Sequence, residues 1–318
     1  MKLLYLTDTH YRGTNPEART DDFPAAIRAK IREIHEIAKR ENVRGILHGG
    51  DLFNRPDVAL SVLGEMELLI MESPAPWYVT PGSHDMVGYN TGTLPRTALG
   101  HAIQLGFVKV LGKDPLVMAD GIHITAAAFD WTIDKDIAHY QPVRRQDCRV
   151  HIHIAHGMLL DHDAPFDHFL IDDIQTDADV ILTGHYHPGF GVIKRRGKIF
   201  CNPGAVARQD ASMAELDRIP NVALIEITNG TMDVRLIPLK SARPGTEVLS
   251  REHLEAAAER ENTMADFVSL LEKTGIDRML DIAELLQKLA LVDSIPESIT
   301  KNALDRLARA QERIKGAA

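Results

Sequence analysis

The chain has 318 residues, enough for one large domain or for one domain with an appendage, and 44% of them are apolar, which allows a sizeable core. A formal charge of −9 disfavours a protein coated in positive charge for nucleic acid, but it leaves room for a local basic cleft or bound cations. Two cysteines, Cys148 and Cys201, indicate a reduced intracellular protein without a disulfide framework, and no apolar run reaches membrane-spanning length. We therefore expect a soluble cytoplasmic protein with no membrane partner.

The first hundred residues alternate between strand and helix patterns. The apolar run at 2–6 predicts a buried strand, and a helix is expected from about Asp22, because Ile27, Ile31 and Ile34 recur at helical spacing. Further strands are expected at 43–51 and 76–85, and further helices at 58–72 and 97–106. This alternation favours an α/β core.

Strand patterns dominate the next part of the chain. They lie at 107–111, 121–129, 149–157, 179–187, 222–227 and 232–239, with a hairpin at 191–204. A second sheet is therefore expected, and the predicted fold is an α/β, two-sheet β-sandwich flanked by helices. Helical patterns return from about Arg251, after a linker at 240–247. The predicted division is a domain over 1–240, followed by a linker and a helical C-terminal appendage over 241–318.

Five of the predicted strands end in loops that carry Asp, His or both. These loops are Asp8-Thr9-His10, Gly49-Gly50-Asp51, Gly82-Ser83-His84-Asp85, His156-Gly157 and Gly184-His185-Tyr186-His187. Ligands in α/β folds gather at the carboxyl ends of strands, so if these strands share a sheet, all five loops converge on one cleft. Residues two apart in extended backbone project to the same side, which applies to Asp8 with His10.

The third loop contains the residue types of a hydrolytic triad, but its spacing excludes one. A triad needs three side chains that converge in space, whereas consecutive side chains of an extended chain point to opposite faces. Ser83, His84 and Asp85 are consecutive. They are therefore interpreted together with the other four loops.

Carboxylate and imidazole groups without thiolate suit Mn, Fe or Zn. The loops offer more ligands than one open catalytic ion takes, namely Asp8, His10, Asp51, His156, His185 and His187. This set fits two ions bridged by a carboxylate, the arrangement used for in-line attack on phosphorus. Two cations would also offset the negative charge of a phosphate ester and of this acidic chain. The strand residues His151 and His153 are interpreted as packed or hydrogen-bonded rather than as ligands.

The order D-x-H, G-G-D, G-x-H-D, H-G and G-H-x-H resembles the calcineurin-like metallophosphoesterase superfamily over residues 1 to about 240. A narrower resemblance rests on the stretch 19–57, with its paired acids before a helix and "GGDLF" followed by a proline. This stretch is similar to the SbcD-type nuclease subunit of the SbcC–SbcD DNA-repair complex and to its archaeal, eukaryotic and phage relatives.

The resemblance implies a role for each of these residues. It implies one metal held by Asp8, His10 and His187, a second held by His156 and His185, and a bridge through Asp51. His84 would approach the scissile phosphate, either stabilising charge or protonating the leaving oxygen, and Asp85 would orient His84. In-line attack would come from a metal-bound hydroxide. The metal expected for both divalent ions is Mn2+, and Fe, Zn and Mg are the alternatives.

One position departs from the family pattern. The family usually has asparagine immediately before the histidine of the third motif, and its amide oxygen completes the second metal site. This chain has Ser83 there. Its hydroxyl either ligates directly, ligates through water or leaves a gap, and the change is either natural variation or an inactivating one.

The resemblance implies a Mn-dependent phosphodiesterase acting on DNA, an exonuclease and endonuclease of DNA repair and recombination. Two alternatives stay open: a phosphoesterase acting on nucleotides or phosphoproteins, and a non-catalytic metal-binding subunit. The implied partners are DNA, an SbcC-like ABC-type ATPase docked through the C-terminal helices, and a second copy of the chain through the early helices.

Overall fold

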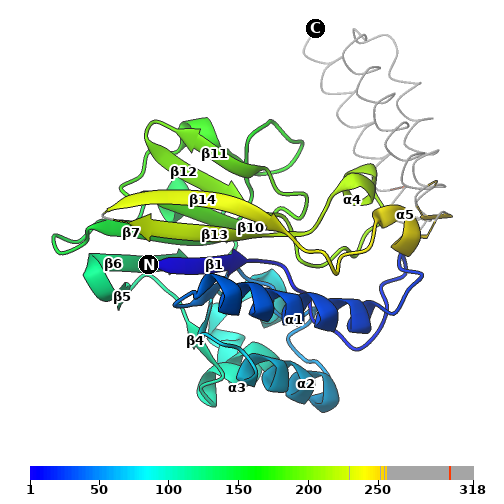
Figure 1. Ribbon diagram of the computed structural model, residues 1–318. Coiled ribbons are helices and arrows are strands. Elements are labelled where there is room, and N and C mark those ends of the chain that lie inside the picture. Colours follow the sequence, from blue (N-terminus) through cyan, green and yellow to red (C-terminus); the bar gives the residue numbers. More distant parts are fainter. Residues whose placement is uncertain (229, 251, 254, 256–300, 302–318) are drawn as a thin grey trace, which may run out of the picture. The chain divides into compact units, whose positions relative to one another are not determined.

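The computed structural model describes residues 1–228, 230–250, 252, 253, 255 and 301 (Figure 1). The larger of two compact units comprises Met1–Gln209 with Asp217–Val248, and the smaller comprises Asp210–Leu216 with the residues from Leu249 onward. The helical appendage expected after Arg251 lies almost entirely outside the described residues. Among the helices within them, none has both the length and the apolar character needed to cross a bilayer.

The first sheet has six strands, ordered β14-β13-β1-β2-β3-β4. Its strands are β1 (Lys2–Leu6), β2 (Ile46–His48), β3 (Trp77–Val79), β4 (Val108–Val110), β13 (Asn221–Thr228) and β14 (Thr231–Pro238). Strands β1 to β4 are parallel, whereas β13 runs antiparallel to β1 and to β14. The carboxyl ends of β1, β2 and β3 therefore meet at one edge of the sheet.

The second sheet also has six strands, ordered β11-β12-β10-β7-β6-β5. They are β5 (Leu116–Met118), β6 (Ile122–Ala127), β7 (Val150–Gly157), β10 (Val180–His185), β11 (Gly191–Arg195) and β12 (Lys198–Asn202). The central strands β6, β7, β10 and β12 are parallel, and β5 and β11 pair antiparallel at the edges. A separate small ribbon joins β8 (Leu159–Leu160) and β9 (Phe169–Leu170).

Alternate residues of the strands fill two different cores. In β1, Leu3 and Tyr5 face the second sheet and share an apolar cluster with residues such as Ile152 of β7. The intervening Leu4 and Leu6 pack in a cluster with the helices. This period of two is expected for a strand that is buried on both faces, and it explains why the run at 2–6 is continuously apolar.

Helices cover the outer face of the first sheet (Figure 1). These are α1 (Phe23–Glu41), α2 (Leu60–Met71) and α3 (Ala98–Gln104). Two short helices, α4 (Met213–Asp217) and α5 (Gly245–Val248), follow later in the chain. The α1 helix begins after Asp22, whose carboxylate accepts from the Ala25 N–H, and ends at Asn42, whose φ of 53° is left-handed. Asp is favoured at the first of these positions and Asn is tolerated at the second. The start predicted at about Asp22 is confirmed.

The predicted two-sheet sandwich flanked by helices is confirmed, with three differences in detail. The strand predicted at 76–85 ends at Val79, because Pro81 has no N–H for a ladder, and a 3-10 turn follows at Ser83–Asp85. The five loops come from both sheets rather than from one. The segment 240–247, predicted as a linker, contains part of α5 and is hydrogen bonded to Glu33 of α1.

Candidate metal centre

The loops after β1 and β2 are held side by side by their own backbones. The Asp8 N–H donates to the Gly50 carbonyl at 3.0 Å, and the His10 N–H donates to the Asp51 carbonyl at 2.9 Å. The second sheet is joined to them through His156, whose Nδ1 contacts the Gly49 carbonyl at 2.7 Å. Carboxyl ends of strands from both sheets therefore meet in one buried seam.

The seam holds several residues in a backbone conformation that only glycine adopts freely. Asp8, His10, Asp51 and His185 have φ values of 53°, 46°, 55° and 74°. Such left-handed non-glycine residues carry a conformational cost and cluster at functional sites, where surrounding contacts hold them. Four of the six predicted metal ligands are among them.

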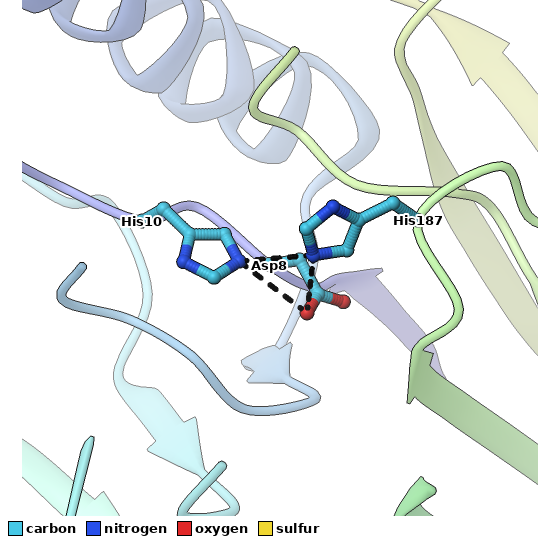
Figure 2. A group of neighbouring side chains, drawn as sticks. All are labelled: Asp8, His10 and His187. Carbon is cyan, nitrogen blue, oxygen red and sulfur yellow. Dashed lines mark hydrogen bonds and ion pairs between the residues drawn. The ribbon is translucent and has the colours of Figure 1, made fainter. Parts of the chain in front are cut away.

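One group of side chains consists of Asp8, His10 and His187 (Figure 2). The two Nε2 atoms of His10 and His187 lie 3.1 Å apart, and they lie 3.8 and 3.6 Å from Asp8 Oδ1. Figure 2 shows both imidazoles and the carboxylate pointing toward a common point. The three ligand atoms are close enough to share one cation.

A second group consists of Asp51, His156 and His185, and a third joins His10, Asp51 and His84. In each group the ligand atoms lie within 4.8 Å of one another. The Oδ2 atom of Asp51 is 3.3 Å from His156 Nε2 and 3.8 Å from His10 Nε2. The Asp51 carboxylate therefore stands between the first two groups, as a bridging ligand would.

The residues present fit divalent cations. Asp8 Oδ1 and His156 Nε2 are buried and make no hydrogen bond of regular geometry among the described residues, and their nearest polar neighbours are other predicted ligands at 3.3–3.8 Å. Burying such atoms without a partner costs free energy, and a cation coordinated by both kinds of atom would remove that cost. Carboxylate oxygen and imidazole nitrogen are donors that suit first-row divalent metals.

The imidazoles are in different protonation states in the metal-free protein. Burial lowers the pKa of His10 to about 3 and that of His185 to about 4, so both are neutral near pH 7 and can coordinate a metal. Burial alone would lower the pKa of His156 as well, but the Asp51 carboxylate outweighs it and raises the value to about 10. Burial opposes ionisation of Asp51, yet the neighbouring imidazoles hold its pKa well below its usual range.

Two glycines make room for this arrangement. A Cβ at Gly82 would lie 2.2 Å from Asp51 Oδ1, and a Cβ at Gly50 would lie 2.2 Å from His156 Nδ1. Gly50 also has a φ of 114°, which side-chain-bearing residues rarely adopt. The glycines of the second and third motifs thus allow the loops to approach the ligands.

Asp85 requires a correction. Its buried carboxylate accepts hydrogen bonds from four backbone N–H groups, those of Asp51, Leu52, Phe53 and Gly82. It therefore holds the loop that carries Asp51 and does not contact the His84 ring. Burial, followed by the Asp51 charge, raises the pKa of Asp85 to about 7, whereas the N–H donors favour its ionised form.

His84 is oriented by a main-chain group instead. Its Nδ1 lies 2.8 Å from the Asn54 carbonyl. Because a carbonyl only accepts, Nδ1 carries the proton and Nε2 is left as the free nitrogen of the neutral ring. The ring is exposed and its centroid lies 4.7 Å from that of His10, so His84 is accessible to a molecule bound at the metal centre.

Ser83 lies beside the bridging carboxylate. Its hydroxyl is 3.3 Å from Asp51 Oδ2, and the residue is 5% exposed. The structure therefore places Ser83 in the seam together with the predicted ligands. The other strand histidines lie elsewhere, since His151 and His153 both bond the Thr125 hydroxyl, as the sequence predicted.

Some supporting residues have no signal in the sequence. The segment 205–207 donates backbone hydrogen bonds to the carbonyls of His187, Thr7 and Asp8, which fixes the first metal group. Its side chains are those of Ala205, Val206 and Ala207 and carry no chemistry. By contrast, His48 could be suspected from its place before the G-G-D motif, and it contacts the Thr9 hydroxyl and the Gly50 N–H.

Residues 1–189, more than half of the chain, match the sequence model of the calcineurin-like phosphoesterase family. This chain belongs to that family. The family consists of phosphoester hydrolases that use divalent metals, in agreement with the carboxylate and imidazole groups described above. The predicted superfamily is therefore confirmed.

Individual relatives are more distant. The chain is 26% identical over 271 residues to the DNA double-strand break repair protein Mre11 of Thermoplasma acidophilum, covering 78% of this chain and 68% of that protein. It resembles a dimetal phosphatase from Danio rerio at 10% identity and a TM-score of 0.50, covering 76% of this chain and 99% of that one. A purple acid phosphatase from Lupinus luteus aligns at 15% identity and a TM-score of 0.48, and the alignment covers 77% of this chain and 52% of that one. The likeness to the Danio rerio structure concerns the fold alone.

The Asp85→Asn variant tests the role of the buried carboxylate. We expect a loss of about 2–4 kcal/mol in the free energy of unfolding, because an amide group leaves buried N–H donors unpaired. Urea denaturation in EDTA measures it, with the exposed Asp114→Asn as control. Unchanged stability together with lost activity would instead support the earlier expectation that Asp85 acts on His84.

The Ser83→Asn variant tests the position that departs from the family. An amide oxygen beside Asp51 adds a ligand atom, so the weaker of two Mn2+ ions is expected to bind about tenfold more tightly. Isothermal titration calorimetry measures this, and Ser83→Ala is the control that removes the hydroxyl without adding a ligand. Superimposable titrations for all three proteins would refute a role of position 83 in coordination.

Proposed function

We propose that this protein is a Mn2+-dependent dinuclear phosphodiesterase acting on DNA, an SbcD-like exonuclease and endonuclease. The position of Asp51 between two ligand groups supports the dinuclear centre most directly. In this proposal Asp8, His10 and His187 hold one ion, His156 and His185 hold the other, and Asp51 bridges. Bound divalent ions supply charge neutralisation of the phosphate and activation of water for in-line attack.

The chain's own contribution to the reaction includes a proton donor at the right place. His84 is the exposed imidazole beside the metal groups, and the Asn54 carbonyl fixes its tautomer. With Nδ1 held, Nε2 is the atom that meets a phosphate oxygen. When protonated, it stabilises the developing charge or gives its proton to the leaving oxygen. Asp85 acts as a positioning residue for the Asp51 loop.

A cleft lined by three arginines (Arg12, Arg28 and Arg55) and two carboxylates (Asp57 and Glu65) supports DNA as the substrate. The loops after β1 and β2 continue past the ligands as a ribbon, with a parallel bridge between Tyr11 and Phe53. This ribbon brings Arg12 and Arg55 to one cleft of about 980 Å³, which Asn54 also lines. Asn54 thus links the cleft to the proposed proton donor, because its carbonyl holds His84.

The two arginines are suited to phosphate groups. The Arg12 guanidinium contacts the neutral Thr14 hydroxyl and, among the described residues, has no ion pair with a carboxylate. Burial, followed by the charge of Arg55, lowers the pKa of Arg12. Arg55 pairs with Asp57 at 3.3 Å, but both side chains are 71% exposed, where an ion pair is weak. A polyanion in the cleft would relieve the repulsion between these cations.

Two partner proposals accompany the nuclease. A homodimer through the early helices rests on the family resemblance. Docking of an SbcC-like ABC-type ATPase to the C-terminal helices rests on the family resemblance, and those helices lie outside the described residues. The similarity to a DNA double-strand break repair protein supports a role in DNA repair and recombination.

A substrate panel tests the proposed function. With Mn2+, we expect cleavage of labelled single-stranded or duplex DNA, loss of cleavage in EDTA, and a decrease of more than about 100-fold in Asp51→Asn, because the bridging carboxylate is removed. A cyclic nucleotide, a phosphopeptide and bis(p-nitrophenyl) phosphate are compared in parallel. Hydrolysis of these compounds with no cleavage of any DNA would sink the nuclease proposal and favour a phosphoesterase of nucleotides or phosphoproteins. Metal binding without hydrolysis of any substrate would favour a non-catalytic metal-binding subunit.

The Arg12→Ala and Arg55→Ala variants test the arginine-lined cleft. Each is expected to weaken DNA binding and to reduce the slope of log K against log salt by about 0.7–0.9, because one phosphate contact is lost. Fluorescence anisotropy over a salt series measures both. The control is Arg40→Ala, an exposed arginine near the end of α1. Hydrolysis of bis(p-nitrophenyl) phosphate should stay unchanged in both variants. An equal loss of hydrolysis of DNA and of bis(p-nitrophenyl) phosphate would contradict a role in binding the phosphates of DNA.

A further inference from the structure

A row of aromatic side chains leads outward from the metal centre on the side of the second metal group. The Phe129 ring lies 5.1 Å from the His185 ring and 6.2 Å from the His156 ring. Tyr89 lies 5.2 Å from Phe129, and Trp131 lies 4.6 Å from Tyr89, each measured between ring centroids. We call Phe129, Tyr89 and Trp131 the aromatic row.

Exposure rises along the aromatic row. Phe129 is 9% exposed, Tyr89 is 39% exposed and Trp131 is 64% exposed. Tyr89 and Trp131 meet edge to face, at an interplanar angle of 88°. In such a contact the edge of one ring covers one face of the other ring. The remaining faces are not covered by the partner ring. Large aromatic residues gain free energy from burial, and a protein with only 5% aromatic residues places two of them at the surface here.

The aromatic row is tied to the frame of the metal centre. The Phe129 N–H donates to the Pro81 carbonyl at 3.0 Å, two residues before Ser83. Tyr89 follows His84 by five residues and has a left-handed φ of 57°, directly after Gly88 with a φ of 58°. A non-glycine residue in this region is held there by its surroundings at a conformational cost, as at many ligand-binding loops.

The chemistry of the row selects among phosphate esters. A flat, apolar surface beside a phosphoesterase centre recognises an ester whose organic part carries a planar face. Phosphoserine and sugar phosphates have none, whereas every nucleobase has one and stacks on aromatic rings with little regard to sequence. The cleft that contains Arg12 and Arg55 is also lined by Asn54, whose carbonyl holds His84, and it offers cations for phosphates. The two surfaces therefore match the two parts of a nucleotide chain.

We propose that Tyr89 and Trp131 form a stacking platform for an unpaired nucleobase close to the scissile phosphate. This inference rests on the proposed nuclease function and adds the form of DNA that the site takes. A base in a duplex is already stacked and paired, so only a single strand, an overhang or a frayed end can present its face to the platform. DNA with unpaired bases near the cleaved bond is therefore the preferred substrate.

The tryptophans of the chain provide a direct readout. There are two, and Trp77 is 1% exposed, so a change in intrinsic fluorescence on binding reports on Trp131. Oligothymidylate is titrated into the 318-residue protein in EDTA, which prevents cleavage. We expect saturable quenching by the oligonucleotide and little quenching by an abasic oligomer of the same length, since the latter keeps the phosphates and lacks the bases.

Variants separate stacking from other effects. In fluorescence anisotropy, Trp131→Ala and Tyr89→Ala are each expected to weaken oligothymidylate binding by about fivefold or more. Trp131→Phe keeps an aromatic face and should bind within about twofold of the unchanged protein. Leu105→Ala removes an equally exposed apolar side chain (60%) ahead of β4, at the opposite end of the first sheet, and should have no effect.

The outcomes distinguish the platform from the nuclease. Absence of quenching, equal affinity for the abasic oligomer, or unchanged affinity in Trp131→Ala would each overturn the platform, whether or not the protein cleaves DNA. Quenching that is lost in the abasic oligomer, in a protein that cleaves no DNA with any metal, would support the platform and reject the nuclease. If the protein is a nuclease, overhang substrates should be cleaved faster than blunt duplexes, and Trp131→Ala should remove most of that difference.

Discussion

The buried carboxylate of Asp51 is the group on which the arrangement of the loops depends. It lies at 1% exposure among imidazoles of both sheets and accepts hydrogen bonds from the His84 N–H and the Ser83 hydroxyl. A buried charge of this kind is tolerated only when it is paired and hydrogen bonded. The third loop meets this need with its amide and hydroxyl groups, and Asp85 fixes the backbone from which Asp51 projects. The residues of the third loop therefore both fix the position of the Asp51 carboxylate and compensate its charge.

The two-sheet sandwich explains why so many carboxylate and imidazole groups lie close to Asp51. Each sheet has a parallel centre, so carboxyl strand ends gather at one edge, and the two edges face each other across the seam. Loops after β1 and β2 supply Asp8, His10 and Asp51, while β7, β10 and the loop after β10 supply His156, His185 and His187, so each of the first two metal groups draws on both sheets. Because each strand is held by apolar packing on both faces, its last residue is fixed within a rigid frame. Polar atoms that would be costly elsewhere are thereby held close together.

Much of this could be predicted from the sequence because the relevant signals are local. Continuous apolar runs define the strands, Asp22 marks the start of α1, and the glycines beside Asp51 and His84 mark turns with close backbone approach. The distribution of strands over two sheets could not be predicted, because pairing is a long-range property that period-two patterns do not encode. The same limit explains the error at Asp85. Its partners in the second loop are main-chain N–H groups that lie 30 or more residues away in the sequence. Main-chain N–H groups have no residue-specific signature, so the sequence does not reveal these bonds. The aromatic row was missed because Tyr89 and Trp131 are separated in sequence and meet only through the fold.

The central place of β1 has a consequence for the order in which the protein can be made. Among the described strands β1 leaves the ribosome before the others, yet it pairs with β13, which ends at Thr228, on one side and with β2 on the other. Until β13 emerges, one edge of β1 offers unpaired backbone groups, which favour association with other chains. The residues at 205–207 that hold Asp8 and His187 also arrive late. The region that matches the family, 1–189, therefore contains every predicted ligand but not the strand and the segment that complete their support. Assembly of the site is a late event of synthesis, although its first ligand is the eighth residue.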